Sequence, residues 1–258
     1  MTQKRAAITG VASGIGAATA KLFQQRGVAV VGFDRNEPDF AIDAFHKVDL
    51  GDPASIDAAT GGLTDRFDYL CNIAGVPPTQ DKRTVLRVNF FGMRHFTDAI
   101  GPRLNDGASI VTVASLAGIN WRNDIEVVRS GLATPFDQAD AWIEAHAEAG
   151  AASYHLSKEL VIGWTATHWD SWRGRGIRMN TVSPGPVSTP ILSDFIQTLG
   201  KRAEEDLKLN RAGTAEEIAP VILFLCSDDA GWINGADIPT DGGAGANALR
   251  QMLNLQPA

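Results

Sequence analysis

Short apolar runs alternate with longer amphipathic segments along most of the chain. Bounded apolar runs are typical of buried strands, and a repeat of about 3.6 residues is typical of helices. The pattern predicts strands over residues 6–9, 28–33, 69–73, 109–114, 177–182 and 236–239. It predicts helices over residues 14–26, 52–63, 83–104, 153–172 and 215–225. Because such alternation implies right-handed crossovers, we expect an α/β fold with one doubly wound parallel sheet flanked by helices.

One segment breaks this alternation, between the strand that ends near Ser115 and the helix that begins near Ser153. Its residues 134–137, Thr-Pro-Phe-Asp, are typical of a helix N-terminus. Four apolar residues then share one helical face: Phe136, Ala139, Ile143 and Ala147. We therefore predict a single domain over residues 1–258 with a partly helical, lid-like insertion at about 116–150.

Composition narrows the class of protein. The 258 residues carry a net charge of −7, which argues against a nucleic-acid groove or an anionic membrane surface as partner. The two cysteines, Cys71 and Cys226, lie in apolar runs, so a disulfide framework is not expected. No apolar run reaches the length of a signal-peptide core or a membrane span. These features favour a cytoplasmic protein.

The first predicted strand runs into a glycine-rich loop, TGVASGIG over residues 9–16, which opens a helix. Gly10 permits the tight turn, Gly14 allows a pyrophosphate to approach the backbone, and Gly16 allows close packing of helix on sheet. Asp34 ends the second strand, where a carboxylate accepts the ribose hydroxyls of NAD and repels a 2′-phosphate. Asp34 as a solvated turn residue is the alternative, and Arg35 leaves NADP open.

A second group of residues has the chemistry of proton transfer. Tyr154 and Lys158 are four residues apart in a predicted helix and therefore share one face, where an ammonium favours the phenolate. Ser115 ends a strand, where side chains of a parallel sheet face the ligand crevice. Tyr-x-x-x-Lys pairs are also common on solvated helix faces, and Asn89, in the middle of a helix, could equally be a satisfied surface residue.

Other chemistries find less support. The five histidines are scattered, and no Cys/His/Asp spacing predicts a metal site. Ser115 is not surrounded by the Gly-x-Ser-x-Gly turn of a hydrolase. His155 adjoins Tyr154 but points about 100° away on the helix, so we do not expect it to be catalytic.

The order of these motifs, with Pro184-Gly185 and Asp241-Gly242-Gly243 after them, resembles the short-chain dehydrogenase/reductase family over nearly the whole chain. The resemblance implies a Rossmann-type fold and reversible hydride transfer between an alcohol and NAD. It implies that Tyr154 is the general acid/base, that Lys158 lowers its pKa and holds the nicotinamide ribose, that Ser115 binds the substrate oxygen, and that Asn89 holds a relay water. The cofactor-binding residues implied are Gly10, Ser13, Gly14, Ile15, Gly16, Asp34, Arg35, Asp49, Leu50, Asn72, Ala74, Gly75, Tyr154, Lys158, Pro184, Gly185, Val187 and Thr189.

Two segments indicate which branch of the short-chain dehydrogenase/reductase family the chain resembles. Residues 71–77 and 178–192 resemble bacterial coniferyl-alcohol dehydrogenases, and also the 3α-hydroxysteroid dehydrogenase/carbonyl reductases, which carry a long insertion before the tyrosine. The resemblance implies an aromatic allylic alcohol as substrate, with a 3α-hydroxysteroid as the alternative and a non-catalytic NAD-binding regulator as the rival of another class. Small-molecule alcohols, ketones or aldehydes are the expected partners. A homodimer is expected, and the usual tetramer is in doubt because the insertion could cover a subunit face.

The substrate pocket is expected between the insertion and the stretch after Thr189, where apolar residues suit a bulky ring. These are Leu116, Trp121, Trp142, Ile191, Leu192, Phe195 and Ile196. Trp121 and Trp142 could instead only pin the insertion to the body of the protein.

Overall fold

The computed structural model describes residues 3–199 and 211–255. Within these residues, seven strands form one sheet in the order β3-β2-β1-β4-β5-β6-β9, and every neighbouring pair is parallel. The strands are β1 (Arg5–Thr9), β2 (Ala29–Asp34), β3 (Ala44–Lys47), β4 (Phe67–Asn72), β5 (Leu104–Val113), β6 (Arg178–Pro184) and β9 (Asp237–Thr240). The α/β fold with a doubly wound parallel sheet is therefore confirmed, and the point where the strand order reverses lies between β1 and β4.

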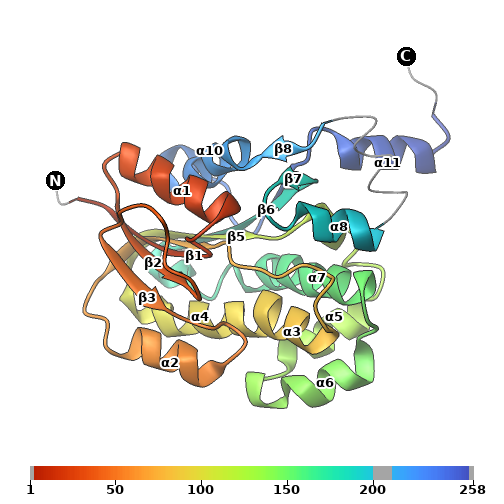
Figure 1. The fold of residues 1–258 in the computed structure, drawn as a ribbon, viewed down its shortest axis with the longest axis horizontal. Helices are drawn as coiled ribbons and strands as arrows, with labels where there is room; N and C mark the ends of the chain where they lie inside the picture. Colours follow the sequence, from red (N-terminus) through yellow and green to blue (C-terminus); the bar gives the residue numbers. More distant parts are fainter. Residues whose placement is uncertain (1–2, 200–210, 256–258) are drawn as a thin grey trace.

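Helices cover both faces of this sheet. On one face α1 (Gly14–Gln25) packs against α10 (Ala215–Cys226), as Figure 1 shows. The opposite face is covered by α2 (Pro53–Gly61), α3 (Lys82–Leu86), α4 (Met93–Ile100) and α7 (Ala151–His168). Each helix layer closes its own apolar core, because a parallel sheet is buried on both sides. None of the helices in the described ranges is long and apolar enough to cross a bilayer.

The structure departs from the predicted elements at one long helix and one short strand. The helix predicted over residues 83–104 is divided by one turn of π-helix, Arg87–Gly92, and Leu104 already belongs to β5. The strand β3 was not predicted, because its sequence Ala-Phe-His-Lys has no apolar run and its residues are only partly buried at the sheet edge. A second, two-stranded sheet, β7 (Val187–Ser188) with β8 (Gly213–Thr214), is too short to leave a sequence pattern.

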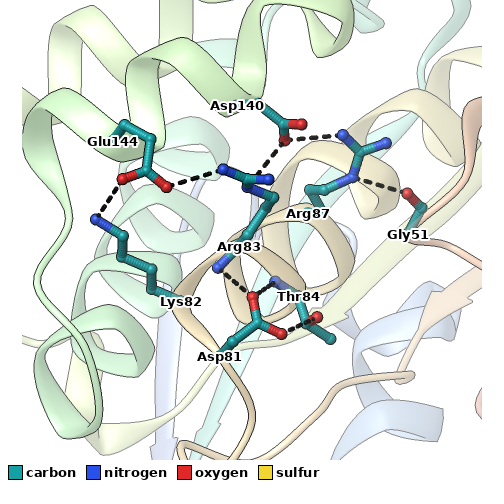
Figure 2. Close-up of polar contacts among 8 residues, drawn as sticks. All are labelled: Gly51, Asp81, Lys82, Arg83, Thr84, Arg87, Asp140 and Glu144. Carbon is teal, nitrogen blue, oxygen red and sulfur yellow. Dashed lines mark hydrogen bonds and ion pairs between the residues drawn. The ribbon is translucent and has the colours of Figure 1, made fainter.

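The insertion contains two α-helices, α5 (Ile125–Ala133) and α6 (Ala139–His146). Only the second was predicted, and the four apolar residues assigned to one face there are all buried as expected. Charged side chains link α6 to α3 and to the π-helix that follows α3, as Figure 2 shows. Glu144 accepts from Lys82 and Arg83, each at 3.0 Å, and Asp140 accepts from Arg87 at 2.8 Å.

Two buried tryptophans of the insertion, Trp121 and Trp142, pack against the body of the protein. The indole of Trp142 packs at a steep angle against the ring of Phe91, with 5.9 Å between centroids, and its Nε1 donates to Ser130 at 2.9 Å. Trp121 is also buried, and its ring lies where a Cβ on Gly163 of α7 would touch it. Neither tryptophan lines the cavity described below, so both pin the insertion and neither contacts substrate space.

Candidate active site

The glycine-rich loop between β1 and α1 depends on two close approaches of backbone. A Cβ on Gly10, whose φ is +73°, would lie 2.8 Å from the backbone of Ala74 after β4. A Cβ on Gly16 would lie 1.9 Å from the carbonyl oxygen of Gly10, so only glycine fits at this first turn of the helix. Ser13 occupies the N-cap without a side-chain cap hydrogen bond, which leaves the first N–H groups of α1 available to an anion.

Asp34 is the last residue of β2 and lies beside this loop, as predicted. Its Oδ2 accepts from the Ala12 N–H at 3.0 Å and its Oδ1 from the Asn36 N–H at 3.1 Å. The carboxylate is therefore held at the loop, with free lone pairs left for a ligand hydroxyl. Arg35 next to it is exposed. The loop, the uncapped helix start and the carboxylate fit the phosphate and ribose groups of a dinucleotide.

Three further residues were expected to contact the cofactor: Asp49, Leu50 and Asn72. Asp49 accepts from Gly51 through Oδ1 at 2.8 Å and so shapes its own turn, next to the buried Leu50. Asn72 does not reach the cavity, because its amide is buried and donates to Thr97 at 2.8 Å and to Thr112. The sequence could not separate this inward role from a cofactor contact, because both use a polar residue at a strand end.

Ala74 and Gly75 come directly after that strand. The N–H of Ala74 donates to the hydroxyl of Thr9 at 3.1 Å, which ties the end of β4 to the end of β1. A Cβ on Gly75 would come within 3.3 Å of Asn89 and 3.8 Å of the Lys158 ammonium. The lack of a side chain at this position therefore leaves space in the cavity beside these two residues.

Ser115, Tyr154 and Lys158 meet at one place although they come from distant segments. Ser115 follows β5 and caps the short 3-10 helix Leu116–Gly118, and its hydroxyl forms a hydrogen bond with Tyr154. Lys158 lies one helical turn after Tyr154 on α7, and its Nζ is 5.6 Å from the centroid of the phenol ring. The same Nζ donates to the Val113 carbonyl at 3.0 Å, which fixes the ammonium at the end of β5.

Asn89 lies next to this cluster, and its side chain holds the backbone of Val76 in place. It sits in the π-helix, where its Oδ1 accepts from the Val76 N–H at 2.8 Å and its Nδ2 donates to the Val76 carbonyl at 3.1 Å. Its Nδ2 also lies 3.2 Å from the hydroxyl of Ser157, which donates to the Tyr154 carbonyl at 2.7 Å. Asn89 is therefore a buried residue joined to α7, and the alternative of a satisfied surface residue is wrong.

Burial governs the protonation of the two central groups. It raises the pKa of Tyr154 to about 12, against a smaller lowering by the Ser115 hydrogen bond. It lowers the pKa of Lys158 to about 8. The pKa of the phenol is thus raised, opposite to the lowering expected from the ammonium, because the low polarity around both groups disfavours their charged forms.

A cavity of about 750 Å³ opens over this cluster. Of the predicted cofactor residues it is lined by Ile15, Gly75, Tyr154, Lys158, Pro184, Gly185, Val187 and Thr189. Of the predicted pocket residues it is lined by Leu116, Ile191, Leu192, Phe195 and Ile196, the last three from α8 (Leu192–Leu199). The loop after β6 adjoins the glycine-rich loop, since a Cβ on Gly14 would lie 3.2 Å from Thr189.

The cavity has further walls that were not predicted from the sequence. The helix α11 (Ala244–Met252) contributes Leu249 and Met252, whose three-residue spacing was a usable signal. Ile119 and Asn120 line it beyond Ser115, and His155 and Glu159 line it from the next face of α7. Among the described side chains, no group of three or more His, Cys, Asp or Glu residues could hold a metal ion.

Known proteins share this arrangement. The family model described as short chain dehydrogenase matches residues 4–126, and that of enoyl-(acyl carrier protein) reductase matches residues 141–245. Coniferyl-alcohol dehydrogenase of Pseudomonas sp. (strain HR199 / DSM 7063) is 40% identical over 247 residues, which cover 94% of this chain and 97% of that protein. The chain belongs to the short-chain dehydrogenase/reductase family. It is an oxidoreductase with the family's Rossmann fold.

Two further members of the family are similar. The 3-alpha-hydroxysteroid dehydrogenase/carbonyl reductase of Comamonas testosteroni is 29% identical, over 93% of this chain and 95% of that protein. The crystal structure of the 3-alpha-hydroxysteroid dehydrogenase from Pseudomonas sp. B-0831, complexed with NADH, superposes with a TM-score of 0.81. That structure is 30% identical, and the match covers 96% of this chain and 99% of that chain.

Proposed function

We propose that the protein is an NAD-dependent dehydrogenase that oxidises an aromatic allylic alcohol to the aldehyde, and reduces it in the reverse direction. One observation carries this proposal: the hydroxyls of Ser115 and Tyr154 and the ammonium of Lys158 meet on the floor of a largely apolar cavity. An apolar cavity of this size suits a ring-bearing substrate. The 40% identity to a coniferyl-alcohol dehydrogenase over nearly the whole chain supports the allylic alcohol.

The residues fit a dinucleotide along the carboxyl edge of the sheet. The first turn of α1 would hold the pyrophosphate, Asp34 the adenosine ribose, Lys158 the nicotinamide ribose, and the loop from Pro184 to Thr189 the nicotinamide end. NAD, when bound, supplies the hydride chemistry. The charge of Asp34 supports NAD over NADP, because a 2′-phosphate beside this carboxylate would be repelled.

The chain's own groups handle the proton. Ser115 and Tyr154 hold the substrate hydroxyl between them. During oxidation Tyr154 acts as the phenolate and accepts the proton of that hydroxyl, and during reduction the same phenol would give the proton back. The Lys158 ammonium stabilises the phenolate electrostatically. Asn89 fixes the loop at Val76 and, through Ser157, the backbone of Tyr154, and it would hold the relay water that resupplies the proton.

A 3α-hydroxysteroid is the second candidate substrate. The fold match to the NADH-complexed 3-alpha-hydroxysteroid dehydrogenase, with its TM-score of 0.81, favours it. A non-catalytic NAD-binding regulator finds no support in the site, because burying Tyr154, Lys158 and Asn89 beside Ser115 is costly where no chemistry requires it.

Formation of NADH, followed by absorbance with coniferyl alcohol and with a 3α-hydroxysteroid as parallel substrates, tests this function. We expect faster turnover of the allylic alcohol. Faster turnover of the steroid would transfer the proposal to the second candidate, and no NADH with either would contradict both.

We also propose that the protein forms a homodimer. The helices α5 and α6 pack against α7 and α3, so the outer face of these two helices is occupied by the chain's own insertion. A tetramer that pairs this face is therefore not expected. Light scattering after size-exclusion chromatography would give twice the mass of one chain, and a mass of four chains would contradict the proposal.

A further inference from the structure

The wall of the cavity carries a carboxyl group to which the chemistry above gives no role. Glu159 lies on α7, is half-buried and lines the cavity. Its side chain makes no hydrogen bond or ion pair with any residue in the described ranges. Burial raises the pKa of this carboxyl, and the negative charge of Asp124 raises it further. A half-buried carboxylate without a donor is unfavourable, so a donor supplied by a ligand would stabilise it.

A second carboxylate that lines the cavity, Asp241, has hydrogen-bond donors that Glu159 lacks. Asp241 accepts from the Gly243 N–H through Oδ1 at 2.9 Å and from the Gly245 N–H through Oδ2 at 2.8 Å. Those bonds shape the turn that begins α11, with one backbone donor on each oxygen. Asp241 therefore has a structural role, whereas Glu159 lines the cavity without a hydrogen-bond donor among the described residues.

The position of Glu159 relative to the reacting group follows from helix geometry. Tyr154 and Lys158 form one stripe on α7, and His155 and Glu159 form the next, about 100° around the helix. Both stripes line the same cavity. Glu159 is five residues after Tyr154, which places it about 7.5 Å further along the helix axis. Because both residues line one cavity, a ring-bearing substrate with its carbinol at Tyr154 would have to span about 7.5 Å along the helix axis to reach Glu159.

The same cavity is also lined by a neutral polar side chain, that of the exposed Asn120. Asn120 lines the cavity five residues after Ser115, and its amide makes no side-chain hydrogen bond among the described residues. Apolar residues that line the same cavity include Leu116, Ile119 and Leu249. The cavity thus combines the reacting group, apolar walls and two further polar side chains, Glu159 and Asn120.

We propose that Glu159 and Asn120 form a distal subsite that binds a hydrogen-bond donor, a phenolic hydroxyl, at the end of the substrate opposite the reacting carbinol. The proposal rests on the proposed function, because the carbinol must sit at Tyr154. The carboxylate accepts the hydroxyl proton as a hydrogen bond, and the charges of Glu159 and Asp124 exclude a substrate that carries an anion at that end. The subsite therefore selects hydroxylated aromatic alcohols over acids of the same shape.

Four alcohols that differ only at the ring position opposite the side chain test this subsite: cinnamyl alcohol and its 4-hydroxy, 4-methoxy and 4-carboxy derivatives. With NAD in excess, we expect kcat/KM for the 4-hydroxy alcohol to exceed that of the unsubstituted and methoxy alcohols by about tenfold, the lower end of what a charged acceptor contributes. The carboxy alcohol is expected to be the poorest substrate.

Two variants assign the preference to the residue. Glu159→Leu is expected to bring the ratio of kcat/KM for the hydroxy and unsubstituted alcohols close to one. Glu159→Gln keeps an acceptor without the charge, so part of this ratio remains while the carboxy alcohol becomes a better substrate. Glu216→Gln, an exposed change on α10, is the matched control and should leave all ratios as in the wild type.

The outcomes separate this inference from the function on which it rests. Equal kcat/KM for the hydroxy and unsubstituted alcohols in the wild type would overturn the subsite and leave the dehydrogenase intact. A tenfold preference that persists in Glu159→Leu would also overturn it. Failure of the wild type to oxidise any of the four alcohols would overturn both.

Discussion

The ring of Phe195 meets the ring of Tyr154 at a steep angle, with 4.9 Å between their centroids and 74° between their planes. Phe195 belongs to α8, so this helix covers the phenol of Tyr154 on one side of the cavity. The contact helps to exclude water from the phenol, and exclusion of water is the reason that the pKa of Tyr154 is raised.

Replacing the phenol hydroxyl tests its role directly. Tyr154→Phe keeps the ring contact with Phe195 and removes the proton acceptor. We expect kcat to fall by roughly 10²–10⁴-fold, the usual contribution of a general acid/base, while NAD binding measured by calorimetry is retained. The chain has two tyrosines, and Tyr69→Phe on β4 is the matched control that should keep its turnover. Undiminished activity of Tyr154→Phe would contradict the mechanism.

The choice of cofactor tests Asp34. Asp34→Asn keeps an oxygen that can accept from the Ala12 N–H and removes the charge. We expect the ratio of kcat/KM for NAD over NADP to fall by about tenfold, equivalent to about 1.4 kcal/mol. Asp39→Asn, an exposed change in the following loop, serves as control. A wild type that already prefers NADP would show that the ribose assignment is wrong.

The buried ammonium predicts a dependence of stability on pH. The pKa of Lys158 is about 8 in the folded protein, below its ordinary value of 10.5. Between these values the unfolded chain binds a proton that the folded protein does not, so the free energy of unfolding rises with pH. The gain is present in full above 10.5 and is lost as pH falls through 8.

Urea denaturation at pH 7 and 9.5, without cofactor, measures this effect. From pH 7 to 9.5 the wild type should gain roughly 2 kcal/mol relative to Lys158→Met, which cannot titrate. Lys47→Met removes an exposed lysine at the end of β3 and should follow the wild type. An equal change in the free energy of unfolding between the two pH values for the wild type and Lys158→Met would show that the ammonium is solvated.

The insertion is held by two kinds of contact, and they should differ in strength. Trp142→Ala empties a buried position against Phe91, so we expect a loss of about 3–5 kcal/mol of stability. Glu144→Gln removes an exposed partner of Lys82 and Arg83, and surface pairs of this kind contribute little. Thermal unfolding of both variants, at low and high salt, compares the two. A larger loss for Glu144→Gln would show that charge anchors the insertion.

Much of the sheet and the central cluster could be predicted from the sequence, because both depend on local patterns. A parallel strand is an apolar run, and the Tyr154–Lys158 spacing is fixed by one helical turn. The inward turn of Asn72 could not be predicted, since its partners Thr97 and Thr112 come from α4 and β5. Trp121 and Trp142 were ambiguous for the same reason, because a buried indole packs equally well in a core or in a pocket.

The π-helix Arg87–Gly92 limits how this part of the gene can change in length. A π turn holds one residue more than an α turn, so deletion of a single residue here would restore a regular helix. Side chains on either side of the turn would keep their direction, but those inside it, which include Asn89, would shift to the spacing of an α-helix. Asn89 would lose Val76 and Ser157 together. Insertions and deletions should therefore be tolerated in the outer loops of residues 116–150 and rejected at this single helical turn.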